Sequence, residues 1–326
     1  MNNLKIDKQN VTSFILNHIF EFLVIVMIIT LSFTASGFLS TTNILGIFRN
    51  MALAGVIAYG MMMAIICGEI DLSVPSTVAL TGIVIGLFCE YLPAYGIPEW
   101  LCVVLGILTM LIFAALIGTF INFLVYRFKM PAFVASMAVM YIIYGFAAVI
   151  SNGFPVTTFP SWYNAIGAGL ILGIPVPAII TLVMFGVTLF LLKYTKFGRS
   201  IYAIGGNSEA ARLNGTNIVR TKRFVFIYVQ ICAVLSGIMA SSQVMSGNFN
   251  FGKGWEFTAI SCVVIGGTAF TGGKGRVWGT FVGLFFYGII TNAMTLLNIN
   301  QYMQYIVRGA LILIAVIINS YNPKHK

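Results

Sequence analysis

About ten apolar stretches, separated by short polar connections, constrain this chain more than any other feature. A helix needs about 20 mostly apolar residues to cross the hydrocarbon layer of a bilayer. Hydrophobic residues make up 59% of the 326 and charged residues only 8%, whereas an ordinary soluble domain is about 25% charged. The sequence therefore predicts an all-α polytopic membrane protein and excludes a water-soluble enzyme, a disordered chain and a disulfide-stapled secreted domain. We expect about ten transmembrane helices, at residues 14–35, 50–67, 72–90, 101–125, 132–151, 170–192, 223–245, 257–271, 277–297 and 303–320.

The basic residues indicate the orientation of these spans. If both termini lie in the cytoplasm, then of the 18 lysines and arginines only Arg49, Lys253 and Arg308 fall elsewhere, and basic residues collect in cytoplasmic loops. We therefore attribute the net charge of +10 to basic residues in the cytoplasmic loops of a membrane protein, and we expect no nucleic-acid partner. The stretch 257–271 is short and bounded by glycines, which also fits a partial or broken crossing.

The longest polar segment on the cytoplasmic side is 193–223. Residues 208–213 within it are good helix formers, Asn207 is a suitable N-cap and Gly215 a suitable stop. The sequence predicts a short, solvated helix between two crossings. This helix has two interpretations, an ordinary connecting loop or a docking helix for a cytoplasmic partner.

Acidic residues stand at two unusual places. Glu69 and Asp71 lie between two apolar spans, and Glu256 begins another. Ionisable groups in such positions are costly and often functional, but carboxylates near a helix N-terminus are also favoured by the helix dipole, and Ser73 is a suitable N-cap for the second of the two spans. The segments 68–73 and 254–260 are similarly placed five crossings apart and face opposite sides, which is the pattern that an inverted 5+5 repeat gives.

The glycine-rich segment 265–280 contains no Gly-x-x-x-x-Gly-Lys-Ser/Thr motif, and neither does the rest of the chain, so no ATP site is encoded. Gly275, Gly279 and Gly283 recur every four residues. We expect them to share one helix face and to allow close helix packing.

Four segments together resemble a known family. These are GlyGluIleAspLeuSerVal at 68–74, the stretch 198–215 with GlyGlyAsnSerGluAlaAlaArgLeuAsnGly, the stretch 259–275 with IleGlyGlyThrAlaPheThrGlyGlyLysGly, and AsnIleAsnGlnTyrMetGlnTyrIleValArgGly at 298–309. In order and spacing they resemble the ribose-type permeases of sugar ABC importers over nearly the whole chain. The chain departs from the family pattern at Pro75, where the family usually has Gly, and at Ser208, where it often has Pro.

The resemblance implies a single transmembrane permease domain, 1–326, in the bacterial cytoplasmic (inner) membrane, without a cofactor of its own. It implies three partners: a second permease chain (identical or paralogous), a cytoplasmic ATP-binding subunit and an extracytoplasmic sugar-binding protein. The coupling loop 193–223 would contact the ATPase through Arg199, Gly205, Gly206, Asn207, Glu209 and Arg212.

Candidate residues of the sugar pathway are Glu69, Asp71, Ser73, Asn152, Asn248, Glu256, Thr268 and Asn292. For each of them, a packing or capping role is an interpretation at least as well supported. A second hypothesis is a proton-coupled secondary transporter for a small polar solute, with Glu69, Asp71 or Glu256 as the proton site. A membrane-embedded enzyme is disfavoured, because the two histidines, His18 and His325, stand at the chain ends.

Overall fold

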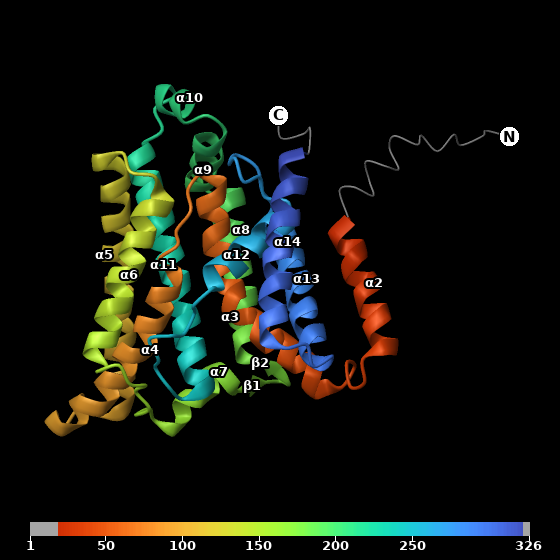
Figure 1. Cartoon of the computed structure of the whole chain (residues 1–326). Helices are drawn as coiled ribbons and strands as arrows, with labels where there is room; N and C mark the ends of the chain where they lie inside the picture. The colour runs from red at the N-terminus through yellow and green to blue at the C-terminus, as the bar shows by residue number, and fades with distance from the viewer. Residues whose placement is uncertain (1–18, 322–326) are drawn as a thin grey trace.

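The computed structural model describes residues 19–321, and nearly every element in that range is a helix running along one common axis (Figure 1). The predicted all-α class is confirmed. A β-hairpin of β1 (Leu170–Ile171) and β2 (Ile174–Pro175) and two short 3-10 turns, Leu92–Tyr95 and Ser161–Tyr163, complete the secondary structure. In chain order the helices are α2 (Ile19–Thr34), α3 (Thr41–Ile66), α4 (Val74–Tyr91), α5 (Glu99–Phe128), α6 (Ala132–Ile150), α7 (Asn164–Ala168), α8 (Val176–Tyr194), α9 (Lys196–Gly206), α10 (Ser208–Leu213), α11 (Ile218–Val244), α12 (Trp255–Ile265), α13 (Val277–Leu296) and α14 (Gln301–Tyr321).

Within the described residues, seven helices are long and apolar enough to cross a membrane: α3, α4, α5, α6, α8, α11 and α13. The helices α2 and α12 are apolar but shorter. Each of the ten predicted spans contains a helix, although residues 14–18 of the first span lie outside the described part of the chain. The count of about ten crossings stays a prediction.

Several helix ends differ from the predicted ones for local reasons. The helix α3 begins well before residue 50, because the side chain of Ser40 accepts a hydrogen bond from the Asn43 N–H and caps it there. The helix α11 begins before 223 because Asn217 caps it in the same way. The helix α8 begins after 170 because Leu172 and Gly173 adopt positive φ angles and turn the chain into the hairpin.

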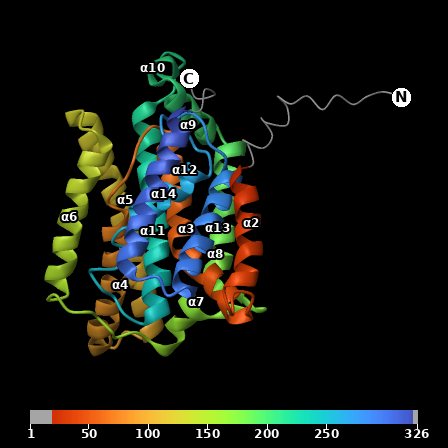
Figure 2. The ribbon, with the colours of Figure 1, turned by 45° about the vertical axis from the view of Figure 1, so that its right-hand side comes forward.

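Basic side chains collect at one end of the bundle, which we call the basic end. Arg127 and Lys193 lie in the last turns of α5 and α8, and Arg220 lies in the first turn of α11. Figures 1 and 2 show α9 and α10 at this same end, together with the first described turn of α2 and the last turn of α14. The chain termini themselves lie outside the described residues, so their cytoplasmic location stays a prediction.

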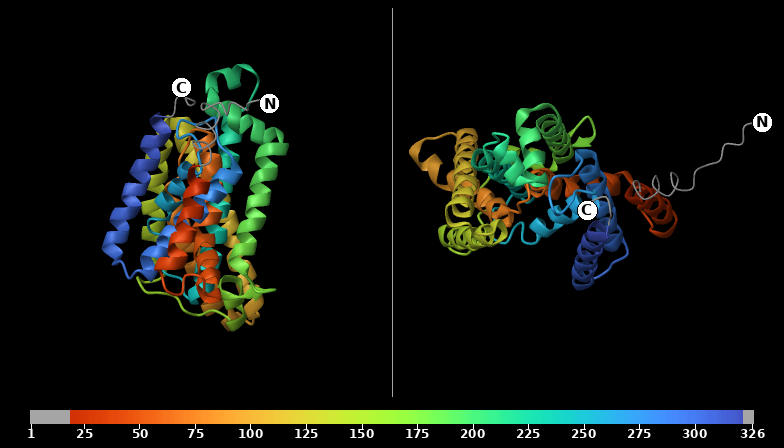
Figure 3. Two further views of the ribbon diagram at one scale, coloured as in Figure 1. Left: turned by 90° about the vertical axis from the view of Figure 1, so that its right-hand side faces the viewer. Right: turned by 90° about the horizontal axis from the view of Figure 1, so that it is seen from above.

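The helix α11 lies at the centre of the packing, in contact with α3, α4 and α5. Seen along the helix axes, the bundle is elongated, with α2 at one end and α5 and α6 at the other (Figure 3). Two buried hydrophobic clusters fill it, one around α3, α12 and α13 and one around α4, α5 and α6.

The glycine face of α13 contains two of the three predicted residues. A Cβ atom at Gly279 would lie 1.9 Å from the carbonyl oxygen of Gly266, and Gly283 approaches α12 as closely. Gly275 departs from the expectation of a shared helix face, because α13 begins only at Val277. It lies in the connection before the helix, where it is also tightly packed.

Two helices begin inside the bundle rather than at one of its ends. The helix α4 begins beside the middle of α11, where Gln230 contacts Ser73. The helix α12 begins beside the middle of α13, where the hydroxyls of Thr258 and Tyr287 lie 3.0 Å apart. The two run in opposite directions, α4 away from the basic end and α12 towards it (Figure 1). Each is preceded by a non-helical segment that enters the bundle.

Candidate functional site

The first helix break, residues 67–73, enters the bundle because a glycine follows the end of α3. Gly68 adopts the left-handed conformation with φ of 79°, a backbone conformation that glycine takes at low cost. The N–H of Leu72 donates to Ser136 Oγ of α6 at 2.9 Å, which holds the extended segment against that helix. Pro75 lies in the first turn of α4, where a missing N–H breaks no helical hydrogen bond.

Asp71 lies at the inner end of this break and is completely buried. Its Oδ1 accepts hydrogen bonds from the N–H and the Oγ of Ser73, at 2.9 and 2.6 Å, and its Oδ2 accepts one from Gln230 Nε2 at 2.7 Å. Gln230 also donates to Ser73 Oγ at 2.7 Å, and its Oε1 accepts from Thr77 Oγ1 at 2.6 Å. Both carboxylate oxygens are therefore occupied by donors, which is what a buried charge requires.

This network ties the start of α4 to the middle of α11. Ser73 begins α4 as predicted, but its hydroxyl makes no side-chain cap; it donates to Asp71 instead. Removing any one partner would leave a polar group buried without a hydrogen bond, which costs about 1–3 kcal/mol and more for a charge.

Glu69 lies nearer the basic end and forms an ion pair with Lys222 in the first turns of α11. Both side chains are largely shielded from solvent, with exposed fractions of 11% for Glu69 and 21% for Lys222. The pair connects the first break to the start of α11, where the polar segment 193–223 ends.

The second helix break, residues 245–254, leads from α11 to α12. Gly254 adopts φ of 86° and begins α12. The neighbouring Gly252 packs on α4: a Cβ atom there would lie 3.0 Å from the carbonyl oxygen of Pro75. The two breaks therefore meet at the start of α4. Glu256, in the first turn of α12, is only 7% exposed, and its Oε2 has no hydrogen-bond partner among the described residues.

The remaining pathway candidates lie away from this meeting point. Asn152 is exposed in the turn after α6, and Asn248 accepts a hydrogen bond from the Asn250 N–H within the second break. Thr268 is buried in the connection between α12 and α13. Asn292 forms a reciprocal amide pair with Asn43 of α3, at 2.7 and 3.1 Å. The structure thus brings Glu69, Asp71 and Ser73 to the first break and Asn248 and Glu256 to the second, and it places Thr268 and Asn292 in packing positions.

The polar segment 193–223 contains two short helices at the basic end. The helix α10 has the predicted boundaries, because the Asn207 side chain accepts from the Ala210 N–H and Gly215 follows it with φ of 78°. Glu209 and Arg212 form an exposed, two-point ion pair with distances of 2.5 and 3.1 Å. The hydrogen bonds from Arg212 lower the pKa of the Glu209 carboxyl.

The helix α9 packs on two connections at once. A Cβ atom at Gly205 would lie 1.7 Å from the carbonyl oxygen of Ile66, at the end of α3, and 2.5 Å from the backbone nitrogen of Gly273, between α12 and α13. Tyr202 of α9 donates a hydrogen bond to the carbonyl oxygen of Gly275 at 2.9 Å. A Cβ atom at Gly206 would meet no other atom within 4 Å. The side chain of Arg199 is exposed. One helix therefore contacts the connections next to both broken helices.

Sequence reasoning missed Gln230, Ser136 and Lys222. Their partners in the first break are distant in the chain, by 159 residues for Gln230 and Asp71, so no local spacing relates them. The sequence did contain one indication that Gln230 matters, because a glutamine in the middle of an apolar span must find a hydrogen-bond partner.

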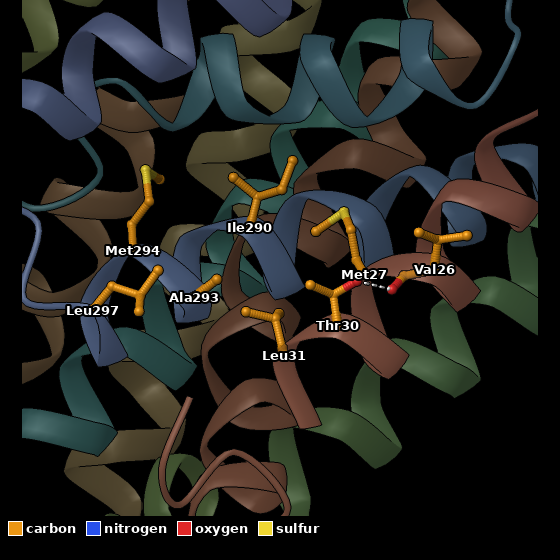
Figure 4. A pocket seen from close by; sticks show the side chains of 8 residues that line it. All are labelled: Val26, Met27, Thr30, Leu31, Ile290, Ala293, Met294 and Leu297. Carbon is orange, nitrogen blue, oxygen red and sulfur yellow. Dashed lines mark hydrogen bonds between the residues drawn. The ribbon is translucent and has the colours of Figure 1, made fainter. Parts of the chain in front are cut away.

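Two cavities of about 270 Å³ each lie between helices, and both are lined by apolar side chains. One lies between α2 and α13 (Figure 4), where Thr30 turns its hydroxyl back to the carbonyl oxygen of Val26. The other lies between α3, α8 and α13. Neither offers the hydrogen-bonding groups that a polar solute needs. Within residues 19–321 no three His, Cys, Asp or Glu side chains come together as a metal site would require.

Comparisons with known proteins relate most of the chain to one family. Residues 43–316 match the family described as the permease component of the branched-chain amino acid transport system. The ribose import permease protein RbsC of Haemophilus influenzae is 37% identical over 301 residues, 91% of each chain. The L-arabinose ABC transporter permease protein AraH of Azospirillum brasilense is 35% identical over 302 residues, 93% of this chain and 87% of that protein. A probable ABC transporter permease protein, YphD of Escherichia coli, is 35% identical over 310 residues, 94% of this chain and 91% of that protein. No solved structure matches.

Proposed function

The chain belongs to this permease family, and within it to the ribose-type sugar importer permeases, and from this premise we propose that it imports a monosaccharide or a related sugar by alternating access. A separate ATP-binding subunit powers the movement, an extracytoplasmic sugar-binding protein delivers the sugar, and a second permease chain completes the pathway. The relatives named for ribose and arabinose support a sugar rather than an amino acid as the substrate.

The observation that carries the proposal is the pair of helices that begin inside the bundle. In transporters, discontinuous helices commonly surround the substrate near the middle of the membrane, and such pairs often belong to inverted repeats. The opposite directions of α4 and α12 (Figure 1) support an inverted 5+5 repeat within ten crossings, and within one permease domain over residues 1–326.

The polar segment 193–223 is the proposed site of ATPase coupling. The helices α9 and α10 lie at the basic end, where α10 projects beyond the long helices (Figure 2), and the bias of basic residues supports a cytoplasmic location for this end and for both termini. A movement of α9 would reach Ile66 and Gly273 directly, because Gly205 contacts the backbone of both. The ion pair between Glu69 and Lys222 adds a link from the start of α11 to the first break.

The alternative of a proton-coupled transporter receives less support. A proton site needs a carboxylate with an acceptor position that can change partners. Both oxygens of Asp71 are held by donors from Ser73 and Gln230, and Glu69 is paired with Lys222. Of the three carboxylates named as proton-site candidates, only Glu256 keeps an oxygen without a partner among the described residues, so the alternative depends on that residue.

Reconstitution tests the proposal. The chain is placed in proteoliposomes with the ATP-binding subunit and binding protein of the same importer, and uptake of labelled D-ribose and L-arabinose is measured with and without ATP. We expect uptake that requires ATP and all subunits. Uptake by the chain alone under a proton gradient would support the alternative instead.

Labelling tests the orientation. A cysteine at Ser208 should react with an impermeant reagent only from the cytoplasmic side, and one at Leu172, which is 98% exposed in the hairpin, only from outside. The opposite result would invert the topology.

A further inference from the structure

The second helix break, residues 245–254, carries exposed polar groups. It lies at a level along the bundle axis where membrane-spanning helices are its neighbours. Lys253, Asn250 and Gly254 are exposed, and the Lys253 ammonium lies 5.5 Å from the centre of the Tyr144 ring on α6. Tyr144 stands about 9 Å along the helix axis from the end of α6, at a rise of 1.5 Å per residue. The connection runs from the outer end of α11 up to the middle of the bundle (Figure 1), so Lys253 lies inside the depth of the spans.

Such a segment cannot face lipid. Irregular backbone occurs within the hydrocarbon region only where protein buries it or water lines it, and a lysine exposed to hydrocarbon is strongly disfavoured. Lys253 donates to Asn250 Oδ1 at 2.5 Å but forms no ion pair with any residue in the described range 19–321. The face of the bundle that carries this break, beside α6 and α12, must therefore face water or another protein.

Two buried polar atoms of α6 and α12, the helices beside this break, have no hydrogen-bond partner among the described residues. These atoms are the Tyr144 hydroxyl and Glu256 Oε2. Glu256 is itself more than nine-tenths buried, and it follows Lys253 by three residues, in the first turn of α12. The Lys253 ammonium lies 5.8 Å from the Phe249 ring.

This set combines a free acceptor, a hydroxyl, an ammonium donor and two aromatic rings. Its formal charges cancel, because it contains one ammonium and one carboxylate. A neutral polyhydroxylated molecule offers hydroxyls to the acceptor and the donors, and its C–H faces pack on aromatic rings.

We propose that Glu256, Lys253 and Tyr144 form the sugar-binding site of the permease. The site lies on the wall of a water-filled pathway, where α6 and α12 line it. The site rests on the proposed function, because the sugar as ligand comes from it. Glu256 accepts hydrogen bonds from sugar hydroxyls through Oε2, Lys253 donates to the sugar, and Tyr144 provides a hydroxyl and a ring face.

Cysteine accessibility in the complete transporter tests the site. Lys253→Cys is labelled with the impermeant cationic reagent MTSET in proteoliposomes that contain all subunits, with and without ATP. The matched controls are Leu172→Cys, in the exposed hairpin, and Val183→Cys, 58% exposed on the apolar helix α8. The five native cysteines are all buried, so the unmodified protein sets the background.

We expect Lys253→Cys to react at least about tenfold faster than Val183→Cys in at least one nucleotide state, because only a hydrated thiol ionises to the reactive thiolate. The transported sugar, D-ribose or L-arabinose, should slow its reaction and leave that of Leu172→Cys unchanged. Labelling as slow as at Val183, or labelling that sugar does not slow, would overturn the proposal.

Uptake by Glu256 variants gives a second measurement. Glu256→Ala should lower ATP-driven uptake at least about tenfold, and Glu256→Gln should lower it less, because the amide oxygen still accepts a hydrogen bond. Equal uptake by all three proteins would also overturn the site. If the unmodified complex imports sugar and these tests fail, the site is wrong and the proposed function stands. If the unmodified complex imports no sugar, the proposed function itself fails.

Discussion

Replacing Gly205 by alanine should disturb the contact between α9 and the two connections beneath it. The new Cβ atom would lie 1.7 Å from the Ile66 carbonyl oxygen and 2.5 Å from the Gly273 nitrogen. Real Cβ contacts essentially never fall below 3.0 Å, so the chain must separate by about 1.3 Å at the first contact. Both neighbours are backbone atoms and cannot turn aside as a flexible side chain would.

The cost has two parts. Overpacking in a well-packed site costs about 1–3 kcal/mol. The Cβ atom would also intrude on the hydrogen bond from the Gly273 N–H to the Ile66 carbonyl, now 2.8 Å long, and the loss of one such bond costs about 0.5–1.5 kcal/mol. We expect Gly205→Ala to lower the free energy of unfolding by about 2–4 kcal/mol.

Thermal melting of the purified protein in detergent measures this cost. A change of 1 kcal/mol shifts the melting temperature by about 2–4 °C in a chain of 150–250 residues and by less in a longer one, so a fall of several degrees is expected. Gly206→Ala is the matched control, because it lies one residue further along the same helix and meets nothing within 4 Å. If the two variants melted at the same temperature, the close contact of α9 with Ile66 and Gly273 would be refuted.

Three further substitutions test other parts of the structure. Gln230→Leu removes a donor to the buried Asp71 carboxylate and should lower stability by about 1–3 kcal/mol or more; an unchanged melting temperature would mean that the network contributes nothing. Gly279→Leu should lower expression or melting temperature by overpacking against Gly266 of α12, by about 1–3 kcal/mol, whereas a stable and active protein would place that face against lipid. Glu209→Arg should reduce co-purification of the ATP-binding subunit without affecting membrane insertion; normal co-purification with normal uptake would show that Glu209 is merely solvated.

Features encoded by neighbouring residues could be predicted from the sequence. The helix α10 has the predicted boundaries, because its cap at Asn207, its helix-forming residues and its stop at Gly215 all lie within a few positions of one another. The all-α class was equally accessible, since a row of long apolar stretches allows few other structures.

Features that depend on tertiary contacts could not be predicted. The helix α9 contains Gly198, Gly205 and Gly206, and glycine disfavours helices by about 1 kcal/mol per residue, so its sequence reads as a loop. The structure shows why one of them is needed, because Gly205 must approach the backbone of α3 and of the connection after α12. The partners of Asp71 and Glu69 come from α11, far along the chain, and no spacing in the sequence relates them.

The two helix breaks place a carboxylate in similar positions but in different states. Asp71, at the first break, has every oxygen occupied by donors from Ser73 and Gln230, and a carboxylate so completely bonded is suited to hold the start of α4 in place. Glu256, just after the second break, has no partner for Oε2 within residues 19–321, and the exposed Lys253 precedes it by three residues. A buried acceptor without a donor is destabilising by about 1–3 kcal/mol or more, so a molecule with hydroxyl groups would relieve that cost on binding. If the two halves of the chain are an inverted repeat and the proposed sugar site is correct, this difference separates their roles: we expect the first break to hold the structure and the second to bind the sugar.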